Sequence, residues 1–525
     1  MNKNDTFQIL IEDMTDNGEG IGRYNGYTLF VKDSVIGDFI EGKVIKAKKS
    51  YGYGKLTKVI TPSPDRVIPP CPVAGPCGGC QLQALSYDAQ LRFKYNRVLN
   101  HLKRIGGFEN VPIKPVIGME AGFACAKAVP GNANGGESET FKEYANALGN
   151  ANGGENKTSM LPLRYRNKAQ YPVGRSRDGR IIAGYYAGRT HSIIECEDCL
   201  LGDPVNSKIL KIIISHMEEY KIEPYNEETH SGLVRHVLIR KGCHTGEIMV
   251  CIVINGTKLT AVEQLVQRLC KIAGMTSISL NVNREKGNVI LGTRIINIFG
   301  PGYITDKIKD ISYHISPLSF FQVNPVQTEK LYSKALEFAG LTGSETVWDL
   351  YCGTGTISLF LARAAKQVYG VEIIPAAIEN AKDNARLNSI TNAEFFVGKS
   401  EEVLPEKYAE SGGRLNADVI VVDPPRKGCE ENLLEVITRM QPQRIVYVSC
   451  DSATLARDLK YICERGYEPK ELQPVDMFPM SVHVEACCLL TKTSAAQSEF
   501  TAAAVPASAK HESGTTSDFL ERISN

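Results

Sequence analysis

Three groups of residues in this 525-residue chain have the side chains needed for covalent chemistry. A cysteine stands in Ser449-Cys450-Asp451, directly after the strand-like run 444–448. A carboxylate stands in Asp423-Pro424-Pro425, directly after the strand-like run 418–422, and another in His483-Val484-Glu485. A cysteine thiolate is a nucleophile, and a positioned carboxylate can accept a proton from a reacting group. These residue types together indicate a covalent mechanism with a separate proton acceptor.

Methylation of a pyrimidine at C5 is a reaction that needs this combination, because the C5 carbon of uracil is a poor nucleophile. Addition of a thiolate to C6 places electron density on C5, which then takes a methyl group. A base removes the C5 proton, and the thiol leaves by elimination. The target base must also be extruded from its stack. We predict that Cys450 is the nucleophile and Glu485 the proton acceptor, with His483 as the alternative acceptor.

A glycine loop earlier in the chain indicates a cofactor site. The strand-like run 347–350 leads into Tyr351-Cys352-Gly353-Thr354-Gly355-Thr356 and a helical run, and the next strand ends in Glu372. Such a loop lets the backbone approach a ligand closely, and the acid can accept both ribose hydroxyls. NAD is the competing ligand, but Ser358 stands where its fingerprint requires a third glycine. The pattern therefore favours S-adenosylmethionine.

These motifs must be positioned by the elements around them. From Ile315 to about Lys492 strands alternate with helices, which is typical of a Rossmann-like, doubly wound parallel sheet. Ligands bind such sheets at the carboxyl ends of the strands, where both catalytic motifs fall. The rigid Pro424-Pro425 pair would hold Asp423 in place to accept a hydrogen bond from a base N–H or from the cofactor. We predict an α/β methyltransferase domain over residues 316–492.

The N-terminal residues 1–62 predict a small β-barrel of the OB type. Short β-like runs are separated by turns at Asp16-Asn17-Gly18 and Asn25-Gly26. Lysines are interleaved with Tyr51 and Tyr53 in its later half, so that phosphates and unpaired bases could both be bound. A solvated lysine edge that discourages strand aggregation is the equally weighted alternative. The β-like runs are 7–11, 27–31, 39–47 and 54–60, and the lysines are Lys43, Lys46, Lys48, Lys49, Lys55 and Lys58.

Residues 63–315 predict a central α+β domain that begins with a cysteine-rich loop. Helical runs are expected at about 87–104 and near 259–273, and β-like runs at 233–240, 247–254 and 288–298. Cys71, Cys77 and Cys80 lie close together among prolines and glycines, and three such thiols in a constrained loop indicate a metal that needs one distant fourth ligand. Zinc and a [4Fe–4S] cluster both accept four cysteines. We expect a disordered low-complexity insertion at about 121–160, which repeats an Asn-Ala-Asn-Gly-Gly-Glu sequence, and a disordered tail at 493–525.

The bulk composition restricts the class of protein. A hydrophobic fraction of 43% and a charged fraction of 23% are typical of a soluble globular protein. No apolar run is long enough for a membrane span, and the N-terminus has no signal-peptide pattern, so we expect a cytoplasmic protein without a membrane partner. The 15 cysteines then favour metal or catalytic roles over a disulfide framework.

The motifs and their order resemble the RNA uracil-C5 methyltransferases of the RumA/TrmA type across essentially the whole chain outside the insertion and tail. The N-terminal barrel resembles a TRAM domain, an RNA-binding module, which favours RNA binding by its lysines. The matching segments are 316–324 (Ser-Pro-Leu-Ser-Phe-Phe-Gln-Val-Asn), 349–355, 423–428, 449–451 and 483–485.

The resemblance implies roles for individual residues. It implies that Cys450 is the nucleophile, that Glu485 is the proton acceptor, and that S-adenosylmethionine is bound by Gln322, Tyr351, Glu372 and Asp423. The ribosomal-RNA branch of the family holds a [4Fe–4S] cluster, which implies Cys71, Cys77, Cys80 and a fourth ligand. That ligand is Cys199, with Cys196 as its rival.

The resemblance to this branch also implies the partner. We expect 23S rRNA to be the substrate and the protein to be a monomer. One departure from the general methyltransferase pattern is Gly398-Lys399-Ser400, where many relatives carry an acid near the adenine, so no adenine contact is assigned there.

Three other functions compete with this interpretation. A tRNA uracil methyltransferase is disfavoured, because by resemblance that branch lacks the barrel and the cysteine loop. A cytosine-C5 RNA methyltransferase is disfavoured, because Arg426 stands where those enzymes place a cysteine after the proline. A non-catalytic RNA-binding protein with a zinc-stabilised loop is disfavoured by the complete set of Cys450, Asp423 and Glu485.

Overall fold

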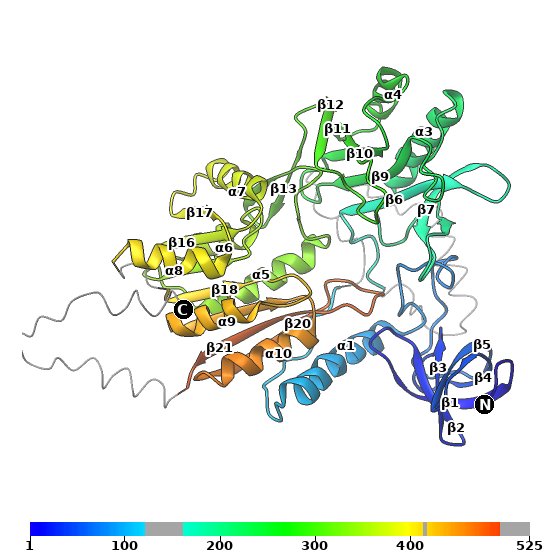
Figure 1. Ribbon diagram of the computed structural model, residues 1–525, viewed down its shortest axis with the longest axis horizontal. Coiled ribbons are helices and arrows are strands. Elements are labelled where there is room, and N and C mark those ends of the chain that lie inside the picture. The colour runs from blue at the N-terminus through cyan, green and yellow to red at the C-terminus, as the bar shows by residue number, and fades with distance from the viewer. Residues whose placement is uncertain (121–160, 413–416, 494–525) are drawn as a thin grey trace, which may run out of the picture.

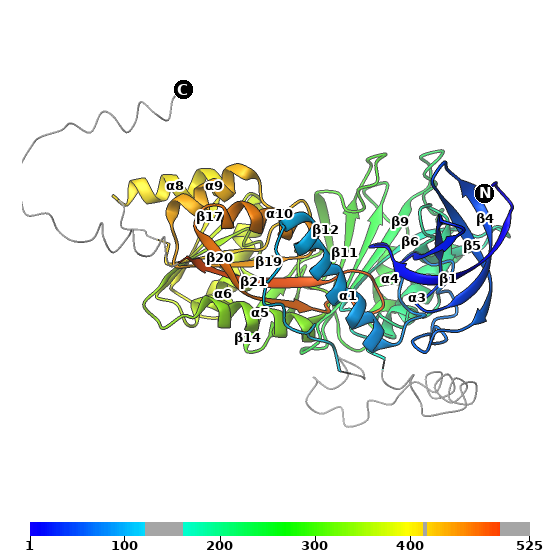
Figure 2. The same cartoon turned by 90° about the horizontal axis from the view of Figure 1, so that it is seen from below.

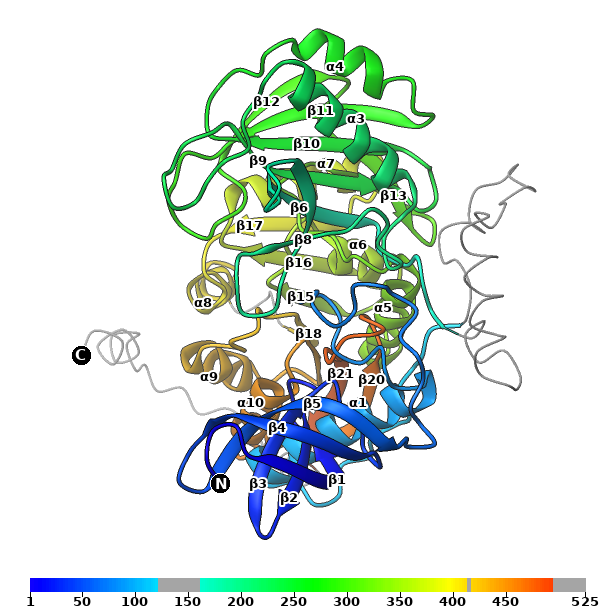
Figure 3. The same ribbon diagram turned by 90° about the vertical axis from the view of Figure 1, so that its right-hand side faces the viewer.

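We analysed a computed structural model, which describes residues 1–120, 161–412 and 417–493 (Figure 1). The predicted insertion at 121–160 and nearly all of the predicted tail lie outside the described residues. The described chain forms three sheets and a small hairpin. The N-terminal barrel and the central sheet lie at opposite ends of the same side of the molecule, and the C-terminal sheet lies beside both (Figures 1 and 3).

The N-terminal element is a closed five-stranded barrel, as predicted, in the order β1-β2-β3-β5-β4. Alternating side chains of its strands point inward and form a small core around Phe7, Leu29 and Ile40. Gly42 and Gly54 leave room for the Phe7 ring, because a Cβ at either position would lie within 2.5 Å of it. The strands are β1 (Thr6–Met14), β2 (Gly20–Tyr24), β3 (Tyr27–Lys32), β4 (Phe39–Ala47) and β5 (Tyr51–Thr61).

A cysteine-containing loop leads from the barrel into helix α1 (Tyr87–His101), which continues as one turn of π-helix, η1 (Leu102–Gly106). Ser86 caps the start of α1, since its hydroxyl accepts a hydrogen bond from the N–H of Ala89. The sequence predicted this helix to run to about residue 104. The helix lies along the C-terminal sheet and ends near α10 (Ser452–Cys463) (Figure 1).

The central domain is a seven-stranded mixed sheet in the order β12-β11-β10-β9-β6-β7-β8, with two helices on one face. A single strand over 288–298 was predicted, and this is wrong. Only its end forms β12, because the Asn283 side chain donates hydrogen bonds to the carbonyls of Val289 and Ile290 and closes a loop there. The elements are β6 (Lys168–Arg175), β7 (Ile181–Tyr186), β8 (Ile193–Glu195), α3 (Val205–Glu219), β9 (Val234–Lys241), β10 (Ile248–Ile254), α4 (Val262–Leu269), β11 (Met275–Val282) and β12 (Arg294–Phe299).

The C-terminal domain is a seven-stranded sheet in the order β17-β16-β15-β18-β19-β21-β20, which confirms the doubly wound α/β prediction. Its first five strands are parallel, and β21 runs antiparallel to β19. The hairpin β13 (Ile304–Ile308) and β14 (Ile311–Ile315) precedes it. The strands are β15 (Thr346–Leu350), β16 (Gln367–Glu372), β17 (Ala393–Val397), β18 (Val419–Val422), β19 (Arg444–Ser449), β20 (Tyr467–Val475) and β21 (Glu485–Lys492).

Helices cover both faces of this sheet and bury two separate cores. In Figure 2, α5 and α6 lie on one side of the strands, and α8 and α9 lie on the other. The strand order reverses between β15 and β18, where such sheets bind ligands. No helix within the described ranges has the length and apolar composition needed to cross a membrane. The helices are α5 (Pro325–Ala339), α6 (Thr356–Ala362), α7 (Pro375–Leu387), α8 (Ser400–Glu410), α9 (Glu431–Met440) and α10.

Candidate active site

Cys450 lies in the tight turn between β19 and α10. Asp451 caps the helix, because its carboxylate accepts hydrogen bonds from the N–H groups of Ala453 (2.9 Å) and Thr454 (3.1 Å). The Ser449 hydroxyl donates to the Asp451 carbonyl at 2.9 Å, which fixes the turn from its other side. The Cys450 side chain is half-buried at the carboxyl end of a buried strand. The thiol is therefore held in place and remains reachable.

Glu485 is the first residue of β21, the strand beside β19. Because these two strands are antiparallel and Ser449 pairs with Ala486, the start of β21 lies at the same edge of the sheet as Cys450. Glu485 is only 3% exposed, and its Oε2 atom has no hydrogen-bond partner among the described residues. A buried carboxylate without a partner is costly for a fold and is characteristic of functional sites.

Asp423 follows β18 and begins a loop that is tied to α10. Gly428, with φ at 78°, closes the loop by donating to the Pro425 carbonyl at 2.8 Å. Arg457 of α10 donates to the Lys427 carbonyl at 2.9 Å. The Asp423 carboxylate itself has no hydrogen bond to any residue that the structure describes, so both of its oxygens are available to a ligand.

The charges of this group are coupled. Burial, followed by the negative charges of Glu485 and Asp423, raises the pKa of the Cys450 thiol to about 12, and Arg426 opposes this. Burial and the Asp423 charge raise the pKa of Glu485 to about 8, again against Arg426. Burial also raises the pKa of Asp423 to about 6. The structure therefore brings Cys450, Glu485 and Asp423 together, with Arg426 as their nearby cation.

His483 lies next to this group but is a weaker base. Burial, and then the positive charge of Arg426, lower the pKa of its imidazole to about 4. Its ring lies edge-on to Phe478, with 6.0 Å between ring centroids. A proton acceptor that works near neutral pH needs a pKa close to that range. Glu485 meets this requirement better than His483.

The glycine loop follows β15 and faces Glu372 at the end of β16. Glu372 accepts hydrogen bonds from the N–H of Gly353 (3.3 Å) and of Ile374 (3.0 Å), which orients its carboxylate at the loop. Tyr351 has a φ of 77°, a conformation that non-glycine residues rarely adopt and that is concentrated at functional sites. Gly355, with φ at 80°, starts α6. The loop thus places backbone N–H groups and a carboxylate where an adenosine ligand can bind.

The two other predicted cofactor residues, Tyr351 and Gln322, also contact other parts of the protein. The Tyr351 phenol packs against the core beneath α9, where the charges of Cys429 and Glu401 help burial to raise its pKa. Gln322 is buried in the loop before α5, and its backbone carbonyl accepts a hydrogen bond from the Asn167 side chain of the central domain at 3.0 Å. The Ser319 hydroxyl of the same loop accepts from Asn380 of α7 at 3.4 Å. This loop therefore bridges the central domain and the helix that follows Glu372.

Two buried groups beside the glycine loop were not predicted from the sequence. Asp349 of β15 accepts a hydrogen bond from Ser358, and burial raises the pKa of its carboxyl to about 7. The Tyr332 hydroxyl of α5 lies 3.2 Å from the Thr356 hydroxyl, and its pKa is raised by burial and by the Asp423 charge. The sequence signal for Asp349 was its position just before the glycine motif, whereas Tyr332 lies in α5, well before that motif. They connect the cofactor loop to the catalytic end of the sheet.

The cysteine loop lies against the central domain. Gly78 donates a hydrogen bond to the Tyr186 carbonyl at 3.0 Å. Burial raises the thiol pKa of all three loop cysteines, to about 12 for Cys80, and the charge of Cys199 raises each of them further. Cys199 therefore lies close to all three, and Cys196 lies close to Cys71 and Cys77. Nevertheless, the described ranges contain no group of three or more Cys, His, Asp or Glu side chains spaced to hold a metal ion.

The barrel presents lysines on its outer surface. Lys43 pairs with Lys55 across β4 and β5, and Lys46 pairs with Tyr53, so these cations lie on one stretch of the sheet. The ring of Tyr53 lies 5.9 Å from that of Tyr51. A cationic surface beside aromatic rings can contact both the phosphates and the unstacked bases of an RNA strand.

Comparisons with known proteins agree with this architecture. Residues 292–493 match the model of the tRNA (uracil-5-)-methyltransferase family, and residues 2–57 match that of the TRAM domain. The chain is 47% identical to an RNA methyltransferase of Halalkalibacterium halodurans that carries the description uncharacterized, over 93% of this chain and 98% of that one. It is 46% identical to a similarly described RNA methyltransferase of Clostridium acetobutylicum, over 93% and 98%.

A solved structure shares the fold along nearly the whole chain. The tRNA (uracil-54, C5)-methyltransferase of Pyrococcus abyssi, in complex with S-adenosyl-L-homocysteine, superposes with a TM-score of 0.69 and 28% identity. The match covers 92% of this chain and all of that one. This share is too large for residues 63–525 alone, so the match includes part of the N-terminal barrel. The presence of the barrel does not by itself separate a ribosomal-RNA substrate from a tRNA substrate.

Proposed function

This chain belongs to the RNA uracil-5-methyltransferase family, and we propose that it methylates C5 of a uridine in 23S rRNA through a covalent Cys450 adduct. One observation carries the proposal. Five predicted residues lie at one edge of five neighbouring strands: Glu372, Tyr351, Asp423, Cys450 and Glu485 at the ends of β16, β15, β18 and β19 and the start of β21. A cofactor loop and a covalent catalytic group thus open onto one site.

The residues at the cofactor end fit S-adenosylmethionine. Glu372 is oriented by the Gly353 N–H and can accept the ribose hydroxyls, while the left-handed Tyr351 and Gly355 shape the loop. Gln322 and Asp423 supply an amide and a carboxylate without internal hydrogen bonds in the described chain. Bound there, S-adenosylmethionine supplies the methyl group as a sulfonium electrophile.

Catalysis begins at Cys450. The thiol loses its proton to solvent, and the sulfur forms a bond to C6 of the extruded uracil, which moves an electron pair towards C5 and O4. Arg426 favours the thiolate, because it lowers the Cys450 pKa against the effect of the two carboxylates. Asp423 is available to accept a hydrogen bond from uracil N3–H. C5 is then nucleophilic enough to take the methyl group.

Glu485 completes the reaction. After methyl transfer C5 carries both the methyl group and a proton, and the Glu485 carboxylate accepts that proton. The C5–C6 double bond re-forms, the sulfur–C6 bond breaks, and the Cys450 thiolate is released. A pKa of about 8 means that only a minor fraction of Glu485 is ionised near neutral pH, and that its carboxylate, once ionised, is a stronger base than an exposed one.

The cysteine loop supports a second part of the proposal. We infer that Cys71, Cys77, Cys80 and Cys199 hold a [4Fe–4S] cluster, since thiolates are its usual ligands and the Cys199 charge acts on all three loop thiols. The charges of Cys71 and Cys77 also act on Cys196, which is therefore the rival fourth ligand, while Cys199 acts on all three loop thiols. The methyl transfer moves no net electrons, so such a cluster would support folding or RNA docking.

The RNA class is tested by methylating two unmodified transcripts side by side. Purified protein is incubated with S-adenosylmethionine and either a 23S rRNA transcript or a set of tRNA transcripts, and 5-methyluridine is mapped in each. We expect 5-methyluridine in the 23S rRNA. The Pyrococcus neighbour favours tRNA as the second candidate, and 5-methyluridine in tRNA alone would replace the ribosomal substrate with that one.

A further inference from the structure

The segment that leads into Glu485 is held mainly by contacts from outside its own sheet. Residues 476–484, here termed the strap, connect β20 to β21, and Glu485 is the next residue. Met480 at its centre has a φ of 69°, a conformation that costs free energy unless neighbours enforce it. Contacts that fix the conformation of the strap therefore also fix the position of Glu485 in the site.

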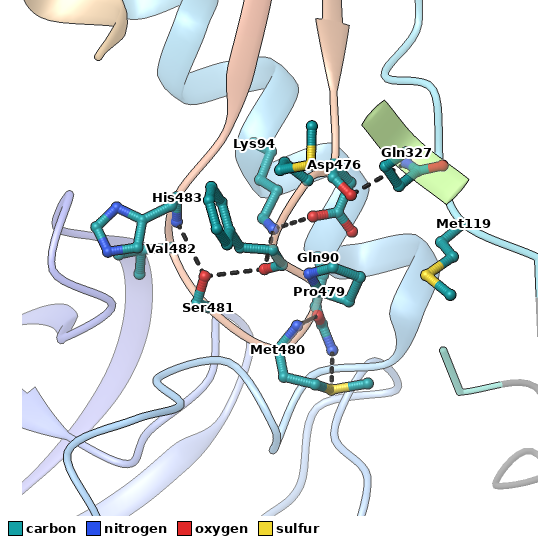
Figure 4. Close-up of polar contacts among 12 residues, drawn as sticks. Gln90, Lys94, Met119, Gln327, Asp476, Pro479, Met480, Ser481, Val482 and His483 are labelled. Atoms are coloured by element: carbon teal, nitrogen blue, oxygen red, sulfur yellow. Dashed lines mark hydrogen bonds and ion pairs between the residues drawn. The ribbon is translucent and has the colours of Figure 1, made fainter. Parts of the chain in front are cut away.

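Helix α1 presents four polar side chains to the strap and to the Cys450 turn. Gln90, Lys94, Arg97 and His101 are spaced four, three and four residues apart, so they form one stripe along the helix. Figure 4 shows Gln90 and Lys94 pointing at the strap.

The Lys94–Asp476 ion pair is the innermost of these contacts. Both side chains are 0% exposed, and the Lys94 ammonium also donates to the Phe478 carbonyl at 3.0 Å. Tyr87 donates to the second Asp476 oxygen at 2.8 Å. Gln327 of α5 donates to the Asp476 carbonyl at 3.0 Å (Figure 4). A buried charge with this many partners fixes one geometry, and removal of one partner is costly.

The other residues of the stripe hold the rest of the strap. Gln90 accepts a hydrogen bond from the Met480 N–H at 2.9 Å, and Arg97 donates to the Val482 carbonyl at 2.7 Å. His101 lies 2.8 Å from the Ser452 hydroxyl, two residues after Cys450. One helix therefore contacts both the segment before the proposed proton acceptor and the turn of the nucleophile.

The same stripe also contacts the barrel. Asp16, in the turn between β1 and β2, lies 3.5 Å from Arg97 and 3.2 Å from His101. A Cβ on Gly18 of that turn would lie 3.1 Å from the Val482 side chain. The strap thus lies between the helix and the barrel, and movement of α1 would be transmitted to Glu485.

We propose that Lys94 is a positioning residue for proton removal, which acts by holding the strap so that Glu485 reaches the uracil C5 proton. This rests on the proposed role of Glu485. Because its side chain is fully buried, Lys94 contacts neither RNA nor cofactor directly. Its loss should leave thiolate addition and methyl transfer working and impair the last step, in which the C5 proton passes to Glu485 and the sulfur–C6 bond breaks.

The test compares Lys94→Met with Arg92→Met. Arg92 lies on the same helix outside the stripe, with its side chain 58% exposed, so it controls for the loss of a cation from α1. Each protein is incubated with S-adenosylmethionine and two RNAs, one with uridine and one with 5-fluorouridine at the target. Turnover is measured with the first RNA, and denaturation-resistant protein–RNA adducts are measured with both.

For Lys94→Met we expect turnover to fall about 100-fold, as for a catalytic group misplaced by about 1 Å. A covalent adduct should accumulate on uridine RNA, and the 5-fluorouridine adduct should form in the wild-type amount. Arg92→Met should match the wild type. Unchanged turnover, or equal losses of turnover and of 5-fluorouridine adduct, would overturn the proposal.

Two further arms keep the result unambiguous. If Lys94→Met does not fold, Gln90→Met replaces it, because it removes the neutral partner of Met480 from the same stripe and should give the same adduct accumulation. Equal losses of turnover and of 5-fluorouridine adduct in Gln90→Met would also overturn the proposal. If the wild type forms no 5-fluorouridine adduct, the proposed function fails first, and this outcome is distinct from a defect confined to the variants.

Discussion

Glu485 at the start of β21 lies beside Cys450 at the end of β19, and its charge helps to raise the pKa of the Cys450 thiol. The two side chains reach one edge of the sheet from antiparallel neighbours. In the free protein this arrangement disfavours the thiolate, and the nearby Arg426 opposes the effect by lowering the Cys450 pKa. It also makes the reactivity of Cys450 a direct measure of the charges around it.

We predict that Glu485→Gln accelerates alkylation of Cys450. Above the Glu485 pKa of about 8 the wild-type carboxylate is charged and raises the thiol pKa, so its removal should increase the thiolate fraction. If the substitution lowers the Cys450 pKa by about one, the reaction with iodoacetamide should become about tenfold faster. Mass spectrometry of the Cys450 peptide measures the rate. Arg426→Ala should slow it, and equal rates in all three proteins would contradict the assigned electrostatics.

The raised Glu485 pKa also predicts a pH-dependent stability. A carboxyl whose pKa is higher in the folded than in the unfolded protein binds more protons when folded, so its ionisation costs stability as pH rises from about 4.5 to about 8. Glu485→Gln removes this cost, which is about 5 kcal/mol at most. Thermal unfolding should show equal stabilities of variant and wild type near pH 4.5, and a more stable variant above about pH 8. A difference independent of pH would contradict the prediction.

Glu372→Ala should weaken cofactor binding. The loss of charge-assisted hydrogen bonds to ribose should lower the affinity for S-adenosylhomocysteine by about 10- to 100-fold in calorimetric titration. Glu379→Ala provides the control, since that exposed carboxylate pairs with Lys382 on the surface of α7. Equal affinities of the two variants would place the ribose elsewhere.

The cysteine loop predicts a coloured protein. Anaerobically purified protein should be brown and contain iron, and Cys80→Ala and Cys199→Ala should both lose the visible absorbance. Cys270→Ala is the matched control, because Cys270 is exposed and distant from the loop in sequence. Loss of iron from Cys196→Ala but not from Cys199→Ala would identify Cys196, and not Cys199, as the fourth ligand. Colourless protein with stoichiometric zinc would favour the non-catalytic RNA-binding alternative.

The motifs were predictable from sequence because each follows a strand within a few residues. Gly353, Asp423 and Cys450 needed only the rule that ligands bind at the carboxyl ends of parallel strands. The family resemblance and the barrel and α/β folds are confirmed by the comparisons and the sheet order. The domain boundaries and the roles of the site residues stay predictions.

The contacts that position the site could not be predicted in the same way. Lys94 and Asp476 are 382 residues apart, and a buried lysine in a helix has no local signature. Strand β11 was missed because its Ser277, Ser279 and Asn281 side chains are polar although all three are fully buried. Tyr351 was assigned to the cofactor by resemblance, and this stays a prediction; its backbone lies at the loop, and its half-buried phenol packs against the core.

The covalent role of Cys450 is tested by trapping its adduct on RNA that carries 5-fluorouridine at the target position. Because the C5 fluorine cannot leave as a proton, the wild type should form a protein–RNA complex that survives denaturation, and proteolysis should map the link to Cys450. Cys450→Ala should form none, although it should still bind S-adenosylhomocysteine. No adduct in the wild type, or an equal adduct in Cys450→Ala, would contradict the covalent mechanism.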